Sequence, residues 1–274
     1  MAEILCSTGA IIGMPNGRDY RLLKDIVPQL ECDGLEFMMY STWYDRVEEI
    51  VAFLKDQKYN IPVLHCAKSV GEGFSAGDDA SVAESFRLFE ANARLAADIG
   101  ADRMVMHLWN GIVSDQHIEN NYRAYERLRE IADKYGVDLL VENVVCNVQN
   151  PYVHWDELMK RYPDVHFVYD TKMAEFHGQT EELYTEERAE LWRDGHIRHY
   201  HVNDYLGGVM DWSRLRTLPV GDGQIDFDRF FDFIKRIGYN GTFTLESTVL
   251  DKTGFVNTGA INRQAEYIRN RMEV

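Results

Sequence analysis

The sequence predicts an α/β fold of the (β/α)8 barrel class, in which eight parallel strands alternate with helices. Three observations predict it. Eight short apolar runs with strand-like composition recur along the 274 residues, stretches with helical periodicity separate them, and six of the runs carry a histidine or a carboxylate at or next to their last residue. Strands that alternate with helices are typical of βαβ units and a parallel sheet. Eight such units fit one closed barrel domain over residues 1–274.

The eight expected strands are rich in Val, Ile, Leu, Met and aromatic residues. In chain order they are EILCS (3–7), GLEFMM (34–39), IPVLH (61–65), RMVMH (103–107), DLLVE (138–142), VHFVYD (165–170), IRHYHV (197–202) and GTFTLE (241–246). An open doubly wound sheet is the alternative architecture. It is disfavoured because no GxGxxG motif follows the first run.

The expected helices show an apolar stripe at intervals of three and four residues. Before the fourth run the stripe consists of Val82, Phe86, Phe89, Ala93 and Ala96, and similar stripes lie in residues 122–132 and 227–237. Such spacing places the residues on one helix face, and core packing is its ordinary role. Several helices are expected to end at a glycine just before the next strand, as in IGADRMVMH, YGVDLLVE and IGYNGTFTLE.

Six ionisable side chains stand at the ends of six successive runs. They are His65, His107, Glu142, Asp170, His201 and Glu246. Burying such a group is costly unless it meets a partner or a metal ion. By the two-residue period of a strand, each points away from the apolar face that packs on the helices and therefore into the lumen. The C-terminal ends of barrel strands meet at one mouth, so a metal site is predicted there.

Bulk composition excludes several classes of partner. The net charge is −16, and no run of Lys or Arg offers a basic face, which disfavours nucleic acid and anionic membranes. No basic segment precedes an apolar run at the N-terminus, and no apolar stretch approaches the ~20 residues of a membrane span. The cysteines Cys6, Cys32, Cys66 and Cys146 are scattered, which favours reduced thiols in a cytoplasmic protein.

A family resemblance rests on eight segments that follow one another along nearly the whole chain. They are CDGLEF, VLH, VMH, LLVEN, VYDTKMAEFHG, HYHVND, LPVGDGQIDF and TFTLES. Together they resemble the xylose isomerase-like TIM barrels. That superfamily groups sugar and sugar-phosphate isomerases and epimerases with apurinic endonucleases of the endonuclease IV type.

The resemblance implies one divalent metal ion held by Glu142, Asp170, His201 and Glu246. Three carboxylates and one imidazole suit Mn²⁺ best, or Mg²⁺, and also accept Co²⁺ or Zn²⁺. Glu142 and Glu246 are the expected catalytic residues, because two carboxylates on separate strands can move a proton on opposite faces of a substrate. The expected reaction is sugar isomerisation or epimerisation by α-proton transfer through a metal-stabilised enediolate.

Five further residues are expected to bind a small carbohydrate substrate: His65, His107, Glu36, His177 and Arg216. For His65 and His107 the alternative is a second metal ion, as in the related endonucleases. Barrels of this family often pair, so a homo-oligomer is open. No phosphate-binding motif is evident, so a free sugar and a sugar phosphate both remain open.

Three departures from the endonuclease pattern disfavour that activity. Met173, Leu215 and Thr217 stand where those enzymes place two histidines and an aspartate around a third zinc ion. These side chains cannot rebuild such a site. The competing functions are a dehydratase of the inosose or dehydroshikimate type, which starts with the same proton removal, and a sugar-binding protein without turnover.

Overall fold

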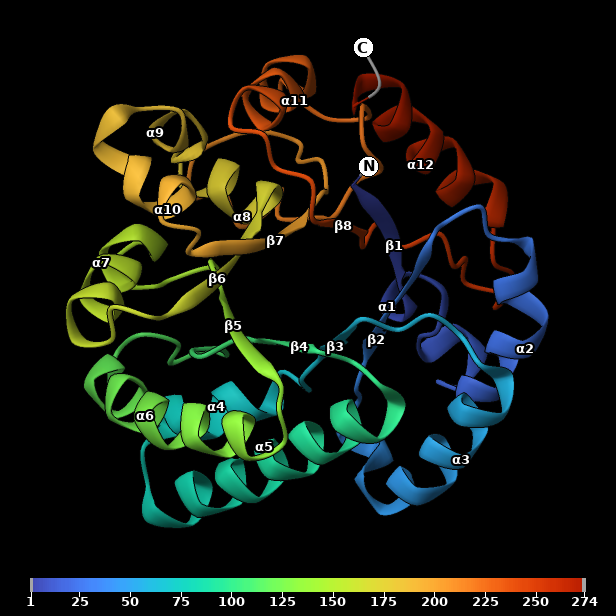
Figure 1. The fold of residues 1–274 in the computed structure, drawn as a ribbon, viewed down its shortest axis with the longest axis horizontal. Helices are drawn as coiled ribbons and strands as arrows, with labels where there is room; N and C mark the ends of the chain where they lie inside the picture. The colour runs from blue at the N-terminus through green and yellow to red at the C-terminus, as the bar shows by residue number, and fades with distance from the viewer. Residues whose placement is uncertain (1, 273–274) are drawn as a thin grey trace. The chain divides into compact units, whose positions relative to one another are not determined.

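Eight parallel strands form a closed barrel in the structure, a computed structural model that describes residues 2–272. The strands follow one another around the barrel in chain order. They are β1 (Glu3–Ser7), β2 (Gly34–Met38), β3 (Val63–His65), β4 (Arg103–Met106), β5 (Asp138–Glu142), β6 (His166–Asp170), β7 (Ile197–His201) and β8 (Thr242–Leu245). Each expected run contains one strand, so the predicted (β/α)8 class is confirmed (Figure 1).

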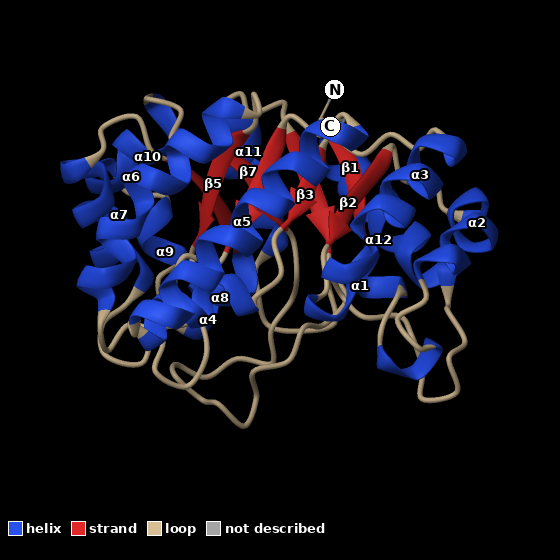
Figure 2. Ribbon diagram, turned by 90° about the horizontal axis from the view of Figure 1, so that it is seen from below, coloured by secondary structure: helices blue, strands red, loops and turns tan. Residues whose placement is uncertain are grey.

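Helices follow the strands along the chain, joined to them by loops (Figure 2). The α-helices are α1 (Thr8–Ile11), α2 (Leu23–Ile26), α3 (Val47–Gln57), α4 (Ser69–Ala76), α5 (Asp79–Ile99), α6 (Ile118–Lys134), α7 (Pro151–Arg161), α8 (Thr171–Phe176), α9 (Thr180–Leu183), α10 (Ala189–Arg193), α11 (Phe227–Arg236) and α12 (Thr258–Met272). Within residues 2–272 none of these helices has the length and apolar character needed to cross a bilayer.

Helix α5 shows how the sequence sets the bounds of an element. Its N-cap, Asp78, accepts a hydrogen bond from the backbone N–H of Ser81 at 3.0 Å. Its C-cap, Gly100, has φ 84°, the left-handed conformation expected from the sequence. Of the predicted apolar stripe, Phe89 is fully buried, whereas Phe86 is half-buried and packs edge-on against a phenylalanine of α4.

The chain divides into two compact units, which are described separately. One contains the residues up to Glu36 and those from Tyr169 onward, and the other contains Phe37–Val168. The expectation of one domain over residues 1–274 stays a prediction.

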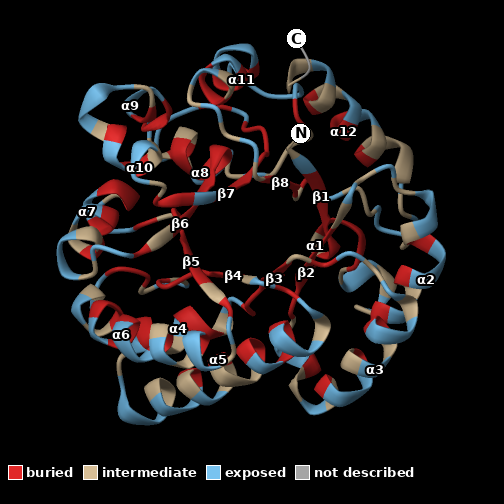
Figure 3. Ribbon diagram, in the orientation of Figure 1, coloured by how far each residue is buried: buried red, intermediate tan, exposed pale blue. Residues whose placement is uncertain are grey.

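In the unit that holds β7 and β8, alternate residues point to opposite faces of the sheet, as predicted. Tyr200 and Phe243 are paired in register, and the Tyr200 ring packs on Phe230 of α11 with centroids 5.8 Å apart. His199 and Thr242 are the preceding pair in register, and their side chains are 2.6 Å apart in a hydrogen bond. Strand β8 is buried along its whole length (Figure 3). One face therefore packs on helices, and the other carries polar side chains.

In the unit of residues 37–168, Asp115 fixes the loop that follows β5. Its carboxylate accepts hydrogen bonds from the backbone N–H groups of residues 147–149 at 2.7–3.0 Å. It also faces Nε2 of His154 at 3.1 Å, and the other ring nitrogen of His154 is 2.6 Å from the hydroxyl of Tyr122. Burial raises the pKa of Asp115, but these hydrogen bonds outweigh it and hold the pKa well below its ordinary value.

Replacement of Asp115 by asparagine is expected to lower the free energy of unfolding by about 3 kcal/mol at pH 7, because it leaves a buried network partly unsatisfied. The pKa of Asp115 is depressed in the folded state. Its ionised form therefore contributes stability above the unfolded pKa of about 3.9, and this contribution is lost as the pH falls further. Urea unfolding at pH 7 and pH 3 measures both effects. Asp45→Asn, at an exposed position, is the control, and equal destabilisation in the two variants would contradict the assignment.

Candidate metal centre

Three of the predicted ligands converge in the unit that contains β6, β7 and β8. Asp170 ends β6, His201 ends β7, and Glu246 directly follows β8. Each offers a ligand atom within 4.8 Å of the other two. The side chains of Asp170 and His201 are fully buried, and that of Glu246 is 16% exposed. Two carboxylates held this close under low exposure need a compensating positive charge, and a divalent cation supplies one.

Asn203 ties the two carboxylates together. Its side-chain Nδ2 donates to Oδ2 of Asp170 at 3.1 Å and to Oε2 of Glu246 at 3.2 Å. Its Oδ1 accepts from the backbone N–H of Glu246 at 3.1 Å. Both carboxylates are therefore oriented by one amide group, which is the supporting arrangement that metal-binding carboxylates usually have.

Glu36 lies beneath His201 in a buried polar cluster. Its Oε2 is 3.1 Å from Nε2 of His201 and 2.9 Å from Nε2 of His199, and it accepts from Oγ1 of Thr244 at 2.8 Å. Burial alone raises the pKa of Glu36, but the charge of His201 and the hydrogen bonds from both histidines outweigh it, so the pKa lies well below its ordinary value. The other oxygen of Glu36, Oε1, is buried without a hydrogen-bond partner among the described residues.

This cluster fixes which ring nitrogen of His201 carries the proton when the ring is neutral, the form that binds a metal ion. An ionised carboxylate only accepts hydrogen bonds, so Nε2 of His201 must carry the proton that Glu36 receives. In the neutral ring the lone pair then lies on Nδ1, which is 3.5 Å from Oε2 of Glu246. Nδ1 is therefore the nitrogen available to a metal ion, and the carboxylate behind the ring is the usual support of a ligating histidine. The polar contacts of Glu36 support His201, and its predicted contact with substrate stays a prediction.

The unit of residues 37–168 holds a second cluster at the ends of β3, β4 and β5. Oε2 of Glu142 is 2.8 Å from Nε2 of His107 and 3.3 Å from Nε2 of His65, and all three side chains are buried. Burial, together with repulsion from Lys68 and His65, lowers the pKa of His107 despite the opposing pull of Glu142. The two imidazoles thus lie together, with ring centroids 5.0 Å apart. Substrate contact by His65 and His107 stays a prediction, with a second metal ion as its alternative.

The remaining predicted residues lie elsewhere. His177 is half-buried at the end of α8, with its ring edge-on to Phe176, and Arg216 is exposed in the loop after β7. Neither belongs to a group of potential metal ligands within residues 2–272, and their roles in substrate binding stay predictions. Met173, at the position of a missing zinc ligand, is buried, and its backbone N–H is bound by Asp170.

Asp204 organises the loop that separates β7 from α11. Its carboxylate accepts from the backbone N–H groups of Tyr205, Gly221, Gly223 and Ile225 at 2.8–3.1 Å. A Cβ atom at Gly223 would lie 2.4 Å from that carboxylate, so only glycine fits there. Residues 221–223, the GDG segment of the sequence, therefore form a turn that is held by the carboxylate of Asp204. The contacts between Asp204 and residues 221–225 were not predicted from the sequence, because they join segments that are far apart along the chain.

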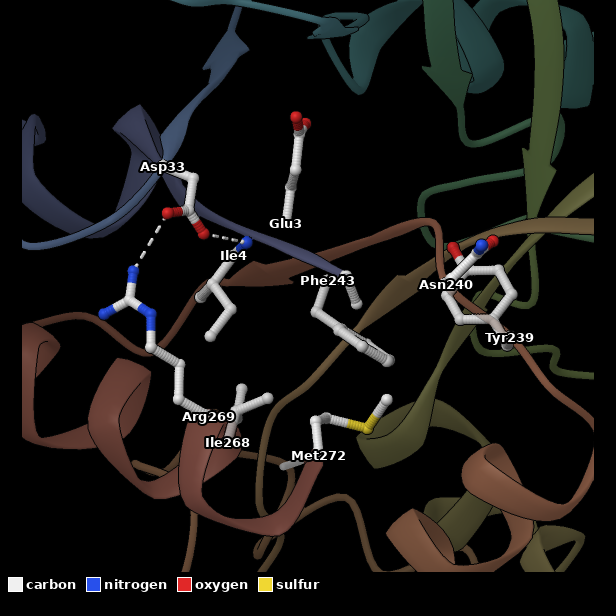
Figure 4. Close-up of a pocket in the computed structure, with 10 residues that line it drawn as sticks. Glu3, Ile4, Asp33, Tyr239, Asn240, Phe243, Ile268, Arg269 and Met272 are labelled. Carbon is white, nitrogen blue, oxygen red and sulfur yellow. Dashed lines mark hydrogen bonds and ion pairs between the residues drawn. The ribbon is translucent and has the colours of Figure 1, made fainter. Parts of the chain in front are cut away.

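A separate cavity of 730 Å³ lies at the start of β1 and β8, away from the ligand cluster at their other ends. Ile4, Phe243, Ile268 and Met272 supply much of its apolar lining (Figure 4). Two of its charged side chains, Asp33 and Arg269, already pair with each other and with the backbone. This cavity is not part of the candidate site.

Comparison with known proteins places the chain in a family. The xylose isomerase-like TIM barrel family matches residues 25–271, and the chain belongs to this family. The predicted family and its barrel fold are thereby confirmed.

Sugar-phosphate epimerases are among the curated relatives of the chain. L-ribulose-5-phosphate 3-epimerase UlaE of Escherichia coli O157:H7 is 23% identical over 206 residues, which cover 71% of this chain and 66% of the relative. The UlaE protein of Shigella flexneri serotype 5b is 22% identical over the same coverage. The matched region thus spans just under two thirds of these relatives.

Solved structures share the fold over almost the whole chain. A D-tagatose 3-epimerase-like protein has a TM-score of 0.73 at 17% identity and covers 99% of this chain and 97% of its own. D-allulose 3-epimerase from Methylomonas sp., in complex with D-allulose, has a TM-score of 0.72 at 18% identity, with 98% and 97% covered. The IOLI protein with a bound zinc atom has a TM-score of 0.73 at 16% identity, with 99% and 98% covered.

Proposed function

We propose that this protein is a divalent-metal-dependent sugar or sugar-phosphate epimerase or isomerase. The observation that carries the proposal is the convergence of Asp170, His201 and Glu246 at the ends of three successive strands, with their donor atoms within 4.8 Å of one another. The sugar epimerases among its relatives support the reaction class.

Glu142 is the fourth proposed metal ligand. It ends β5, and it is paired in register with Val168 on β6. Asp170 stands two residues further along β6, so both side chains belong to the carboxyl ends of neighbouring parallel strands. Residues two apart on a strand project to the same face, which supports a shared site.

The proposed donor set fits a hard or borderline divalent ion. It consists of three carboxylates and Nδ1 of His201, with Asn203 and Glu36 as supports. Oxygen-rich sites of this kind suit Mn²⁺ or Mg²⁺, and the imidazole also allows Co²⁺ or Zn²⁺. The zinc atom in the IOLI structure shows that a protein of this fold holds such an ion.

In the proposed mechanism the two glutamates move a proton. A divalent ion, when bound, supplies a Lewis acid for the carbonyl and hydroxyl oxygens of the sugar. Glu142 or Glu246 removes the proton on the carbon next to the carbonyl, and the other returns a proton to the opposite face. The hydrogen bonds of Asn203 hold Glu246 in place for this transfer. Return to the opposite face of the same carbon epimerises the sugar.

Exchange of the α-proton tests the proposal directly. The Mn²⁺-loaded protein is incubated in heavy water with L-ribulose 5-phosphate, L-ribulose or D-allulose, and deuterium at the carbon next to the carbonyl is followed by NMR. We expect incorporation with at least one ketose. No incorporation with any of them would contradict the proposal, and a dehydrated product would identify the lyase alternative.

Replacement of Glu36 by glutamine is expected to weaken Mn²⁺ binding about 10- to 100-fold, because His201 loses the carboxylate that fixes its tautomer. Competition with a metal chelator at pH 7 measures the dissociation constant. Glu31→Gln, an exposed change on the same segment, should leave it unchanged. Equal affinity in the Glu36 variant and the wild type would show that the carboxylate does not support the ligand.

A further inference from the structure

Lys172 is a buried lysine that has no acidic partner among the described residues. It is 7% exposed, and its Nζ donates one hydrogen bond, to Oγ1 of Thr217 at 3.0 Å. Within residues 2–272 the ammonium group makes no ion pair. An ammonium group carries three donors, and a buried charge is costly unless an anion compensates it. Among the described residues, the ammonium group thus has a hydroxyl acceptor but no carboxylate to compensate its charge.

The place of this lysine is the mouth of the barrel. Lys172 is two residues beyond Asp170, which ends β6. Thr217 precedes Leu218, whose backbone pairs with that of Asp204 in the loop just after β7. Both therefore lie past the carboxyl ends of neighbouring strands, the face on which barrels of this class bind their substrates.

Two comparisons single out Lys172. Lys68 and Lys252 occupy equivalent loops after β3 and β8, but both are exposed, so water compensates their charge. The carboxylates of Asp170 and Glu246, at the same end of the strands, would repel an anionic substrate. A fixed positive charge at that end offsets the repulsion, and a lysine serves a phosphate group as a point charge.

We propose that Lys172 and Thr217 form a subsite for the anionic end of a sugar substrate, either a phosphate ester or a carboxylate. The inference rests on the proposed function and narrows its substrate class to acidic sugars. Lys172 contributes the charge, and the hydroxyl of Thr217 holds the ammonium in position and can donate to the same anion. Arg216, exposed beside Thr217 and without a side-chain partner among the described residues, lies next to this subsite.

Binding measurements separate this inference from catalysis. Isothermal titration calorimetry of the Mn²⁺-loaded protein compares L-ribulose 5-phosphate, a ketohexuronate and uncharged L-ribulose. We expect one of the two acids to bind about 10- to 100-fold more tightly than L-ribulose, as one charge-assisted contact allows. The acid that binds more tightly shows whether the subsite takes a phosphate ester or a carboxylate.

In Lys172→Met this preference should shrink to about threefold or less, whereas Lys252→Met, a matched change at an exposed position, should retain it. Circular dichroism checks that each variant is folded. If Lys172→Met does not fold, Lys172→Gln makes the same comparison with a neutral polar side chain.

Two results would overturn the inference: L-ribulose binding as tightly as both acids, or equal losses for all three probes in the Lys172 variant. Turnover of an uncharged ketose with no preference for an acid would sink the anion subsite and leave the proposed epimerase intact. Tighter binding of an acid without α-proton exchange would support the anion subsite and contradict the proposed epimerase activity.

Discussion

Replacement of Glu246 by glutamine is expected to lower kcat by about 10³-fold or more while the protein remains folded, because the change removes a metal ligand and a proton-transfer group together. The side chain is only 16% exposed and stands at the barrel mouth, so the amide can replace it without a change in volume. Steady-state turnover of the ketose identified by proton exchange measures the effect.

Glu266→Gln is the matched control, since this glutamate is exposed on α12, a helix that carries none of the proposed ligands. It should keep wild-type activity. Metal content by elemental mass spectrometry separates the two roles of Glu246. A variant that is inactive with a full metal complement has lost the base, and one without metal has lost the ligand. Wild-type activity in Glu246→Gln would refute the proposed site.

Removal of the metal ion is expected to abolish activity and to lower the stability of the protein. Dialysis against a chelator should remove turnover, and added Mn²⁺ should restore it. At an ion concentration 100-fold above Kd, binding stabilises the folded state by about 2.7 kcal/mol. For a chain of this size, that corresponds to roughly 5–10 °C in Tm, which calorimetry measures without any substrate.

In Asp170→Asn, which lacks a proposed ligand, dialysis against the chelator should leave the Tm unchanged. This result would support the assignment of Asp170 as a ligand. An unchanged Tm for the wild-type protein before and after dialysis, with full activity retained, would instead mean that the buried carboxylates act without a metal ion.

The fold was accessible from the sequence because its local signals agree. Each apolar run ends where a polar residue or a turn begins, and glycine closes helices such as α5 at Gly100. The two-residue alternation in β8 placed Thr242 and Thr244 on the polar face, where the structure shows them bound to His199. Period and capping are local properties, and a local pattern can be read without knowing what packs against it.

The contacts that support the candidate site join residues far apart along the chain, so they could not be predicted from the sequence. Glu36 and His201 are 165 residues apart, and no spacing signals that a carboxylate on β2 binds the imidazole of β7. In the sequence nothing distinguishes Lys172 from the loop lysines Lys68 and Lys252, and the difference between them is burial. In the sequence, its partner Thr217 stood out only because it occupies a position where the related endonucleases have a zinc ligand.

The carboxylate of Asp204 has a consequence for how this protein can change over time. Because one side chain holds Tyr205 on one side and residues 221–225 on the other, the base of the intervening segment is fixed independently of what the segment contains. Insertions, deletions and exchanges within residues 206–216 can then accumulate without moving His201 or the helix that follows. Grafting segments of different length between these two anchors is a route to new substrate preferences on an unaltered catalytic frame.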